Sequence, residues 1–212
     1  MVLMIYIVIG LEEMHNYMKK FFGHLKNVLI HKYWVFHYCC KFGIPVRGLL
    51  HDMSKFNPIE FFESVKFYQG DKSPIPEIKK ANTVSYAWQH HKGRNPHHYE
   101  YWTDHYDDGS RVCHKIPYKY LMELLADWFA AGKTYALNAG KNFSPKDEYE
   151  WWLKKKENPN LAIHPATMEF IDMFMYDAQF FSPDMNWMRD KHNREVMKYR
   201  LNKLYNGESL LN

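Results

Sequence analysis

Cysteine is scarce in this chain, and its scarcity excludes two kinds of protein. Three cysteines occur among 212 residues; two of them are adjacent, Cys39 and Cys40, and no Cys-x-x-Cys pair is present. Adjacent cysteines do not form an ordinary disulfide, so we expect reduced thiols and a cytoplasmic location rather than a disulfide-stapled secreted protein. A zinc site made of thiolates is excluded for the same reason.

Long apolar runs are also missing. The one predominantly apolar stretch, Met1–Gly10, is about half the length that a helix needs to span a bilayer. It has neither the basic start nor the small-residue cleavage site of a secretion signal. We therefore expect no membrane partner, and we interpret this stretch as a buried start to the fold or as an N-terminal extension of little consequence.

Neither sign of charge dominates, since the formal net charge is only +4. That balance suits a small anionic substrate but is too weak to indicate binding to duplex nucleic acid. Apolar residues make up 46% of the chain, which is enough for one sizeable core. They recur at helical spacing, and no stretch alternates for long in the manner of a strand.

The helix signals predict an all-α fold. Asn57-Pro58 reads as an N-cap followed by the first helical residue, with Glu60 completing a capping box. Residues 95–115 are expected to form a long functional loop. The predicted helices cover 12–42, 46–55, 57–69, 76–91, 144–156, 164–181 and 183–206, with another that begins at Pro117 and contains Asp127. We predict one domain over 1–212, with a core at 12–139 and accessory helices at 140–212.

Histidine, by contrast, is abundant, and the 13 histidines include a pair of adjacent metal-ligand types, His51-Asp52. Imidazole nitrogen and carboxylate oxygen together suit a divalent Mn, Fe, Co, Ni or Zn ion. Two ligands make a weak site, so others must come from polar residues inside apolar helices. His31 and Asp127 both lie among apolar residues of predicted helices. A buried carboxylate such as that of Asp127 is costly unless it is paired or binds a metal, so it is a candidate ligand. His24 and His37 remain alternatives to His31.

The order of these residues resembles the HD-domain metal-dependent phosphohydrolases. The string His51-Asp52-Met53-Ser54-Lys55 is similar to their His-Asp-x-x-Lys, and residues 90–98 are similar to the paired histidines of two-metal members. Ala126-Asp127-Trp128 matches the setting of the family's last ligand. The resemblance covers roughly residues 12–139 and is closest to small bacterial and phage members. A Gly-Tyr-Pro after the paired histidines is missing, so a cyclic-dinucleotide phosphodiesterase is not specifically indicated.

The resemblance implies an HD-like helical bundle and a hydrolase that cleaves a phosphate ester, of a nucleotide or a nucleotide-derived molecule. Tyr99, Tyr101 and Trp102 would then stack on a base. One or two metal ions and a homodimer both remain open. The implied roles are metal binding for His31, His51, Asp52 and Asp127, catalysis for Lys55, His90 and His91, and substrate binding for Lys92, Arg94, His97 and His98.

Two other functions fit the same residues. The ligand set can hold two irons that activate oxygen, as in some HD-domain oxygenases. The fold can also bind a nucleotide without turnover, although an intact ligand set with Lys55 favours a catalyst.

Overall fold

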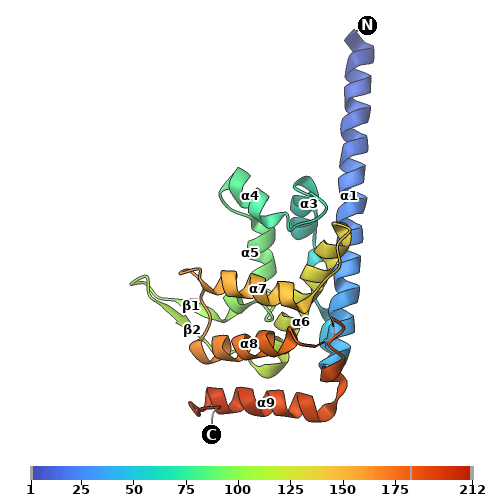
Figure 1. Cartoon of the computed structure of the whole chain (residues 1–212). Helices are drawn as coiled ribbons and strands as arrows, with labels where there is room; N and C mark the ends of the chain where they lie inside the picture. Colours follow the sequence, from blue (N-terminus) through green and yellow to red (C-terminus); the bar gives the residue numbers. More distant parts are fainter. Residues whose placement is uncertain (1, 182, 211–212) are drawn as a thin grey trace.

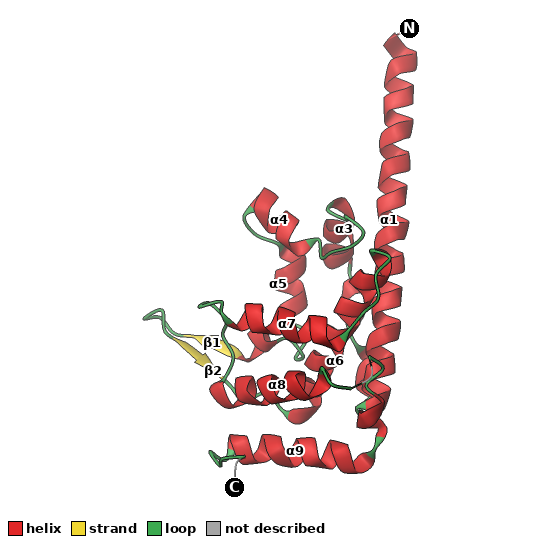
Figure 2. Ribbon diagram, viewed as in Figure 1, coloured by secondary structure: helices red, strands yellow, loops and turns green. Residues whose placement is uncertain are grey.

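The computed structural model describes residues 2–181 and 183–210, with side chains described from Gly10 onward. It is built from helices, with one short two-stranded hairpin (Figures 1 and 2), so the all-α prediction is confirmed. The α-helices are α1 (Val2–Lys41), α2 (Pro45–Leu50), α3 (Pro58–Lys66), α4 (Ile75–Asn82), α5 (Tyr86–Lys92), α6 (Tyr118–Asn138), α7 (Pro145–Lys156), α8 (Pro165–Ala178) and α9 (Lys191–Tyr205). Short 3-10 turns, η1 (Met53–Phe56), η2 (Tyr99–Trp102) and η3 (Asn186–Arg189), and strands β1 (Thr103–His105) and β2 (Arg111–Cys113) complete the chain.

Helix α6 lies at the centre of the core. Every residue from Leu121 to Ala130 is buried. The C-terminal half of α1 packs against α6, where the rings of Tyr38 and Phe129 are 6.3 Å apart. Helices α7 and α8 also contact α6, through Trp152 and Phe174 (Figure 1). A polar residue in the buried part of α6 must therefore find its partners inside the protein.

Several helices begin where the sequence predicts. The Asn57 side chain accepts a hydrogen bond of 3.0 Å from the Ile59 amide, and Ser144 and His164 cap α7 and α8 in the same way. Each of these caps is followed by a proline at the first helical position, where its missing N–H costs nothing. The capping-box role of Glu60 is wrong, however, because its carboxylate accepts from Ser54 and the two histidines of α5 instead.

Other boundaries differ from the prediction. The predicted helix 76–91 is broken at Thr83, whose φ of +66° no regular helix can accommodate, and Ser85 caps a new helix by accepting from the Trp88 amide. Residues 95–115 contain a hairpin with an exposed acidic turn rather than loop alone. Helix α1 begins at Val2 instead of Glu12. The predicted burial of Met1–Gly10 falls on side chains outside the described residues, apart from Gly10, which is exposed.

Two expectations about the whole chain can be compared with the structure. All three cysteines are free, as predicted. Within the described residues, no helix combines the length and the apolar character that crossing a membrane requires.

Glu148 gives a first testable prediction. It is buried in the first turn of α7 with its carboxyl group against Gly132 of α6. Burial, with the charges of Asp147 and Asp127 nearby, raises the pKa of Glu148 from 4.5 to about 8. Between these values the folded protein binds a proton that the unfolded chain has lost, so this group makes stability fall as pH rises through the window.

Glu148→Gln keeps the shape and removes the charge. We expect it to raise the free energy of unfolding at pH 8.5 by about 2–4 kcal/mol and to change it little at pH 4.5, as measured by urea denaturation. Glu150→Gln, on the exposed face of the same helix, is the control. An equal effect of Glu148→Gln at both pH values would contradict the assignment.

Candidate metal centre

Four side chains from three separate stretches of the chain meet beside α6. His31 comes from α1, His51 and Asp52 follow α2, and Asp127 comes from α6. One nitrogen or oxygen atom of each lies within 4.8 Å of the others. The Nε2 atom of His31 is 2.9 Å and that of His51 is 3.4 Å from Oδ1 of Asp127. The structure thus brings together all four residues predicted as ligands.

The alternatives to His31 lie elsewhere. His24 is buried one heptad earlier on α1, where its ring packs against Phe61, and the ring of His37 meets that of Trp34 edge-on. Neither belongs to a potential ligand group among the described residues.

A second group shares Asp52 with the first. It consists of Asp52, His91, His97 and His98, again with one ligand atom of each within 4.8 Å of the others. Oδ1 of Asp52 is 3.2 Å from Nε2 of His97 and 3.4 Å from Nε2 of His91. Oδ2 of Asp52 is 3.1 Å from Nε2 of His51, in the first group. The two carboxylate oxygens of Asp52 therefore face different sets of histidines.

The backbone around Asp52 aims this carboxylate. Asp52 has a φ of +52°, in the left-handed region that aspartate tolerates better than most residues. Just before it, α2 lies against α1, and the Lys32 ammonium of α1 donates to the carbonyl oxygens of Leu49 and His51. Because the backbone turns sharply at Asp52, its side chain is buried in the cluster, and the 3-10 turn η1 begins at the next residue.

Two buried glutamates contact the Nδ1 atoms of the histidines, on the opposite side of each ring from the Nε2 atoms that face Asp52. Glu123 accepts from Nδ1 of His51 at 3.2 Å and lies 3.4 Å from Nδ1 of His97, and its other oxygen pairs with Arg47. Glu60 accepts from Nδ1 of His91 at 2.8 Å. Because a carboxylate only accepts, the facing Nδ1 atoms carry protons, and the Nε2 atoms are the ones that would bind a cation once deprotonated.

Sequence reasoning missed both glutamates. Glu123 precedes Asp127 by four residues, which places both on one face of α6 inside an apolar run, and this spacing was an available signal. Glu60 had a competing local explanation as a capping residue. It also binds His90 through Nδ1, so His90 lies behind the cluster and belongs to neither ligand group.

Several polar atoms at the centre of the cluster are buried without a well-formed hydrogen bond, although three of the imidazole nitrogens face a carboxylate oxygen. They are Nε2 of His31, His51, His97 and His98 and Oδ1 of Asp52. Buried polar atoms that are not hydrogen-bonded cost free energy, and five of them within two adjoining ligand groups is unusual. A divalent cation satisfies such atoms, so the residues present fit a metal ion.

The electrostatics agree with this fit. Burial, with the Lys55 charge nearby, lowers the pKa of His31 to about 4, which leaves a neutral imidazole able to bind metal. Although burial opposes it, the neighbouring histidines hold the pKa values of Asp52 and Asp127 well below the usual range. Burial also opposes the charged form of His51, but the carboxylates raise its pKa well above 6.5. A cation would therefore displace a proton from this ring.

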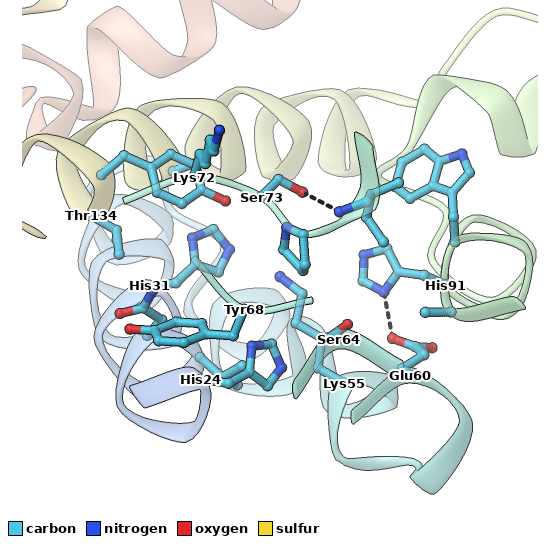
Figure 3. A pocket seen from close by; sticks show the side chains of 18 of the residues that line it. His24, His31, Lys55, Glu60, Ser64, Tyr68, Lys72, Ser73, His91 and Thr134 are labelled. Carbon is cyan, nitrogen blue, oxygen red and sulfur yellow. Dashed lines mark hydrogen bonds and ion pairs between the residues drawn. The ribbon is translucent and has the colours of Figure 1, made fainter. Parts of the chain in front are cut away.

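A cavity of about 190 Å³ opens beside the cluster (Figure 3). Side chains of both ligand groups line it, including His31, Asp127, His91 and His98. Lys55 points into its middle, between His31 and His91, with its ammonium 2.6 Å from Oδ2 of Asp52. The rest of the lining includes His24, Glu60 and small apolar residues, with Lys72 at the rim. It also includes aromatic, hydroxyl and amide side chains, from Tyr68, Tyr135, Trp88, Ser73, Thr134 and Asn27.

The loop between α3 and α4 closes one side of this cavity. It contributes Tyr68, Lys72 and Ser73, and its Gly70 carbonyl accepts from the Asn27 amide at 2.7 Å. This loop was not predicted to take part in the site.

The other residues predicted for substrate binding lie apart from this cavity. Lys92 is half-exposed and Arg94 is exposed, and neither lines it. His97 lies deeper, in the second ligand group. Tyr101 and Trp102 line a separate, open surface pocket beside His164, so they are not placed to stack on a substrate base beside the two ligand groups.

The comparison with known proteins gives one match. The model of DUF5662, a family of unknown function, matches residues 20–177, which include every residue of both ligand groups. Nothing matches among curated proteins or among solved structures.

Proposed function

Because the chain belongs to DUF5662, a family of unknown function, we propose its activity from geometry: it is a metal-dependent hydrolase of small phosphate esters. The order of the ligands along the chain, which resembles that of the HD-domain phosphohydrolases, supports this proposal.

The observation that carries the proposal is the position of Asp52 between two ligand groups whose members His31, Asp127, His91 and His98 line a cavity. His31, His51 and Asp127 would hold one divalent ion, and His91, His97 and His98 a second, with Asp52 shared by both. Bound there, the metal supplies Lewis acidity and lowers the pKa of a water molecule towards neutrality.

The protein's own residues would then bind and orient the ester. Lys55, whose pKa rises because Asp52 and Asp127 outweigh its burial, keeps a positive charge for the phosphoryl oxygens. Lys72 would attract the anion at the rim. The hydroxyl groups of Tyr68 and Tyr135 can donate to the body of the ester.

The size of the cavity limits the substrate. A protein cavity of about 150 Å³ holds a molecule as small as benzene, so about 190 Å³ holds a phosphoryl group and part of its ester. The substrate we propose is therefore a phosphomonoester no larger than a nucleoside monophosphate, with its far end towards the rim.

Lys55→Ala tests the role of the cavity apart from the metal. We expect an unchanged metal content and a fall in kcat/KM of about 10²–10³-fold, since a charge aimed at the transition state is lost. The measurements are elemental analysis and turnover of a panel of phosphomonoesters by the metal-loaded protein. Arg94→Ala, which removes a charge outside the cavity, is the control and should keep full activity.

Full activity of Lys55→Ala would remove that residue from the reaction. Wild-type protein that holds metal but cleaves no phosphate ester would contradict the proposal itself. If such protein held iron and absorbed visible light when oxidised, a di-iron oxygenase would be favoured.

A further inference from the structure

We infer that α1 pairs with α1 of a second copy of this chain, in antiparallel orientation, through an apolar stripe on the side away from the core. The stripe consists of Leu11, Met14, Met18, Phe22, Leu25, Leu29, Tyr33 and Phe36. All of them except the half-buried Leu25 are exposed, with between 39% and 59% of their surface accessible.

The spacing of the stripe is that of a helix-packing surface. Its steps along the chain are 3, 4, 4, 3, 4, 4 and 3 residues, an 11-residue repeat that lies on one face of a nearly straight helix. The residues of α1 that face the core, among them His24, His31 and Tyr38, lie outside this repeat. The stripe thus belongs to a second face, about 38 Å long from Leu11 to Phe36.

Charged residues are excluded from the stripe but present on the same helix. Glu12 and Glu13 stand near its start, and Lys19, Lys20 and Lys26 follow. A stretch exposed only to water would not separate apolar and charged residues in this way. The segregation indicates a face that is covered.

The exposed area is sufficient for a stable dimer. Val46, Leu49 and Leu50 of α2, each more than half exposed, adjoin the C-terminal end of the stripe, where Gly48 contacts Phe36. At about 100 Å² for each half-exposed large side chain, the seven exposed stripe residues and these three present about 1,000 Å². A standard protein interface needs about 800 Å² from each partner.

Two features favour the antiparallel orientation. A parallel pair would place all three lysines of one α1 beside those of the other, whereas an antiparallel pair centred near Lys19 places Glu12 and Glu13 beside Lys26 of the partner and leaves like charges adjacent only around Lys19. The globular part of the protein also surrounds only the C-terminal half of α1, and the N-terminal half projects from it (Figure 1). Antiparallel pairing lets each projecting half lie along the C-terminal half of the other copy.

Sedimentation of the full chain tests the pairing. We expect wild-type protein to sediment as a dimer of the 25.6 kDa chain. Met18→Glu with Phe22→Glu should raise the dimer dissociation constant at least about 100-fold, because four charges enter an apolar interface. Tyr199→Glu, which charges an equally exposed aromatic residue on α9 (63% accessible), should leave it unchanged. Far-UV circular dichroism checks that every variant is folded.

Cysteine cross-linking tests the orientation. In a Cys40→Ser background, Met18→Cys lies near the two-fold axis of the antiparallel pair and should form an intermolecular disulfide, whereas Leu29→Cys should not. Cross-linking at both positions means a parallel pair and overturns the orientation. A monomeric wild-type protein overturns the inference altogether, and if that monomer binds vesicles of anionic lipid, the stripe covers a membrane surface instead.

Discussion

Replacing Asp52 with asparagine should empty both ligand groups at once. The amide keeps the shape of the side chain but cannot supply the anionic oxygens that face the His51 side and the His97 side. Loss of a residue that only hydrogen-bonds to a metal ligand lowers metal affinity by about 10–100-fold. Because Asp52 is itself a ligand, we expect a larger loss. Turnover of phosphate esters should fall on the order of 10³-fold or more, because no activated water remains.

The stoichiometry of bound metal separates a shared carboxylate from an ordinary ligand. Asp127→Asn should weaken only the group that contains His31, and His97→Ala only the group that contains His91. Asp104→Asn, in the exposed hairpin, controls for the change of charge. Elemental analysis after dialysis gives the number of metal ions bound per chain. If Asp52→Asn kept the metal content of the wild-type protein, the two-group arrangement would be wrong.

Removing the charge of Glu123 should give the largest loss of stability. This fully buried carboxylate binds Arg47 and the two histidines His51 and His97. Removing one partner of a buried ion pair leaves the other charge uncompensated, which costs about 3–5 kcal/mol. Glu123→Gln should lower the free energy of unfolding by about that amount, as measured by urea denaturation with chelator present so that metal loss does not contribute.

Arg47→Ala provides the double-mutant control. If the cost arises from the unpaired Arg47 charge, the two substitutions together should destabilise the protein by less than the sum of the single effects. Glu169→Gln, at an exposed position of α8, should be neutral. Additive effects of Glu123→Gln and Arg47→Ala would show that the ion pair is not responsible.

The pH dependence of the same group follows from its pKa. Although burial opposes it, contacts with His51, His97 and Arg47 lower the pKa of Glu123 from 4.5 to about 2. A lowered folded-state pKa contributes stability that is present above pH 4.5 and lost as pH falls towards 2. The difference between wild type and Glu123→Gln should therefore shrink in that acidic window.

Those parts of the fold that depend on local signals were predictable from sequence. Proline at the first helical position located the starts of α3, α7 and α8, and polar residues inside apolar helices identified His31 and Asp127. The break at Thr83 was not predictable, because neither glycine nor proline marks it and the left-handed backbone there carries no local signal. The tertiary structure decides that residues 86–92 turn away from α4.

The predictability of the site had a similar limit. A ligand is recognisable by its chemical type and its place in the chain, and this was enough to select the first group. The roles of Glu60 and Glu123 depend on which histidine nitrogen faces them, which only three-dimensional packing determines. Lys92 and Arg94 are close to the histidines in sequence, but Lys92 ends α5 half-exposed and Arg94 is exposed in the turn that follows, and neither lines the cavity.

Gly48 shows how far the candidate chemistry depends on a residue with no chemistry of its own. A Cβ atom at this position would lie 2.6 Å from Cβ of Cys39 and 2.9 Å from Cα of Phe36, so only a hydrogen atom fits between α2 and α1. His51 and Asp52 follow within four residues, and their distance from His31 is therefore set by how closely two backbones approach. A relative with all the same ligand residues would therefore still lose the metal-binding geometry if alanine replaced the glycine three residues before His51.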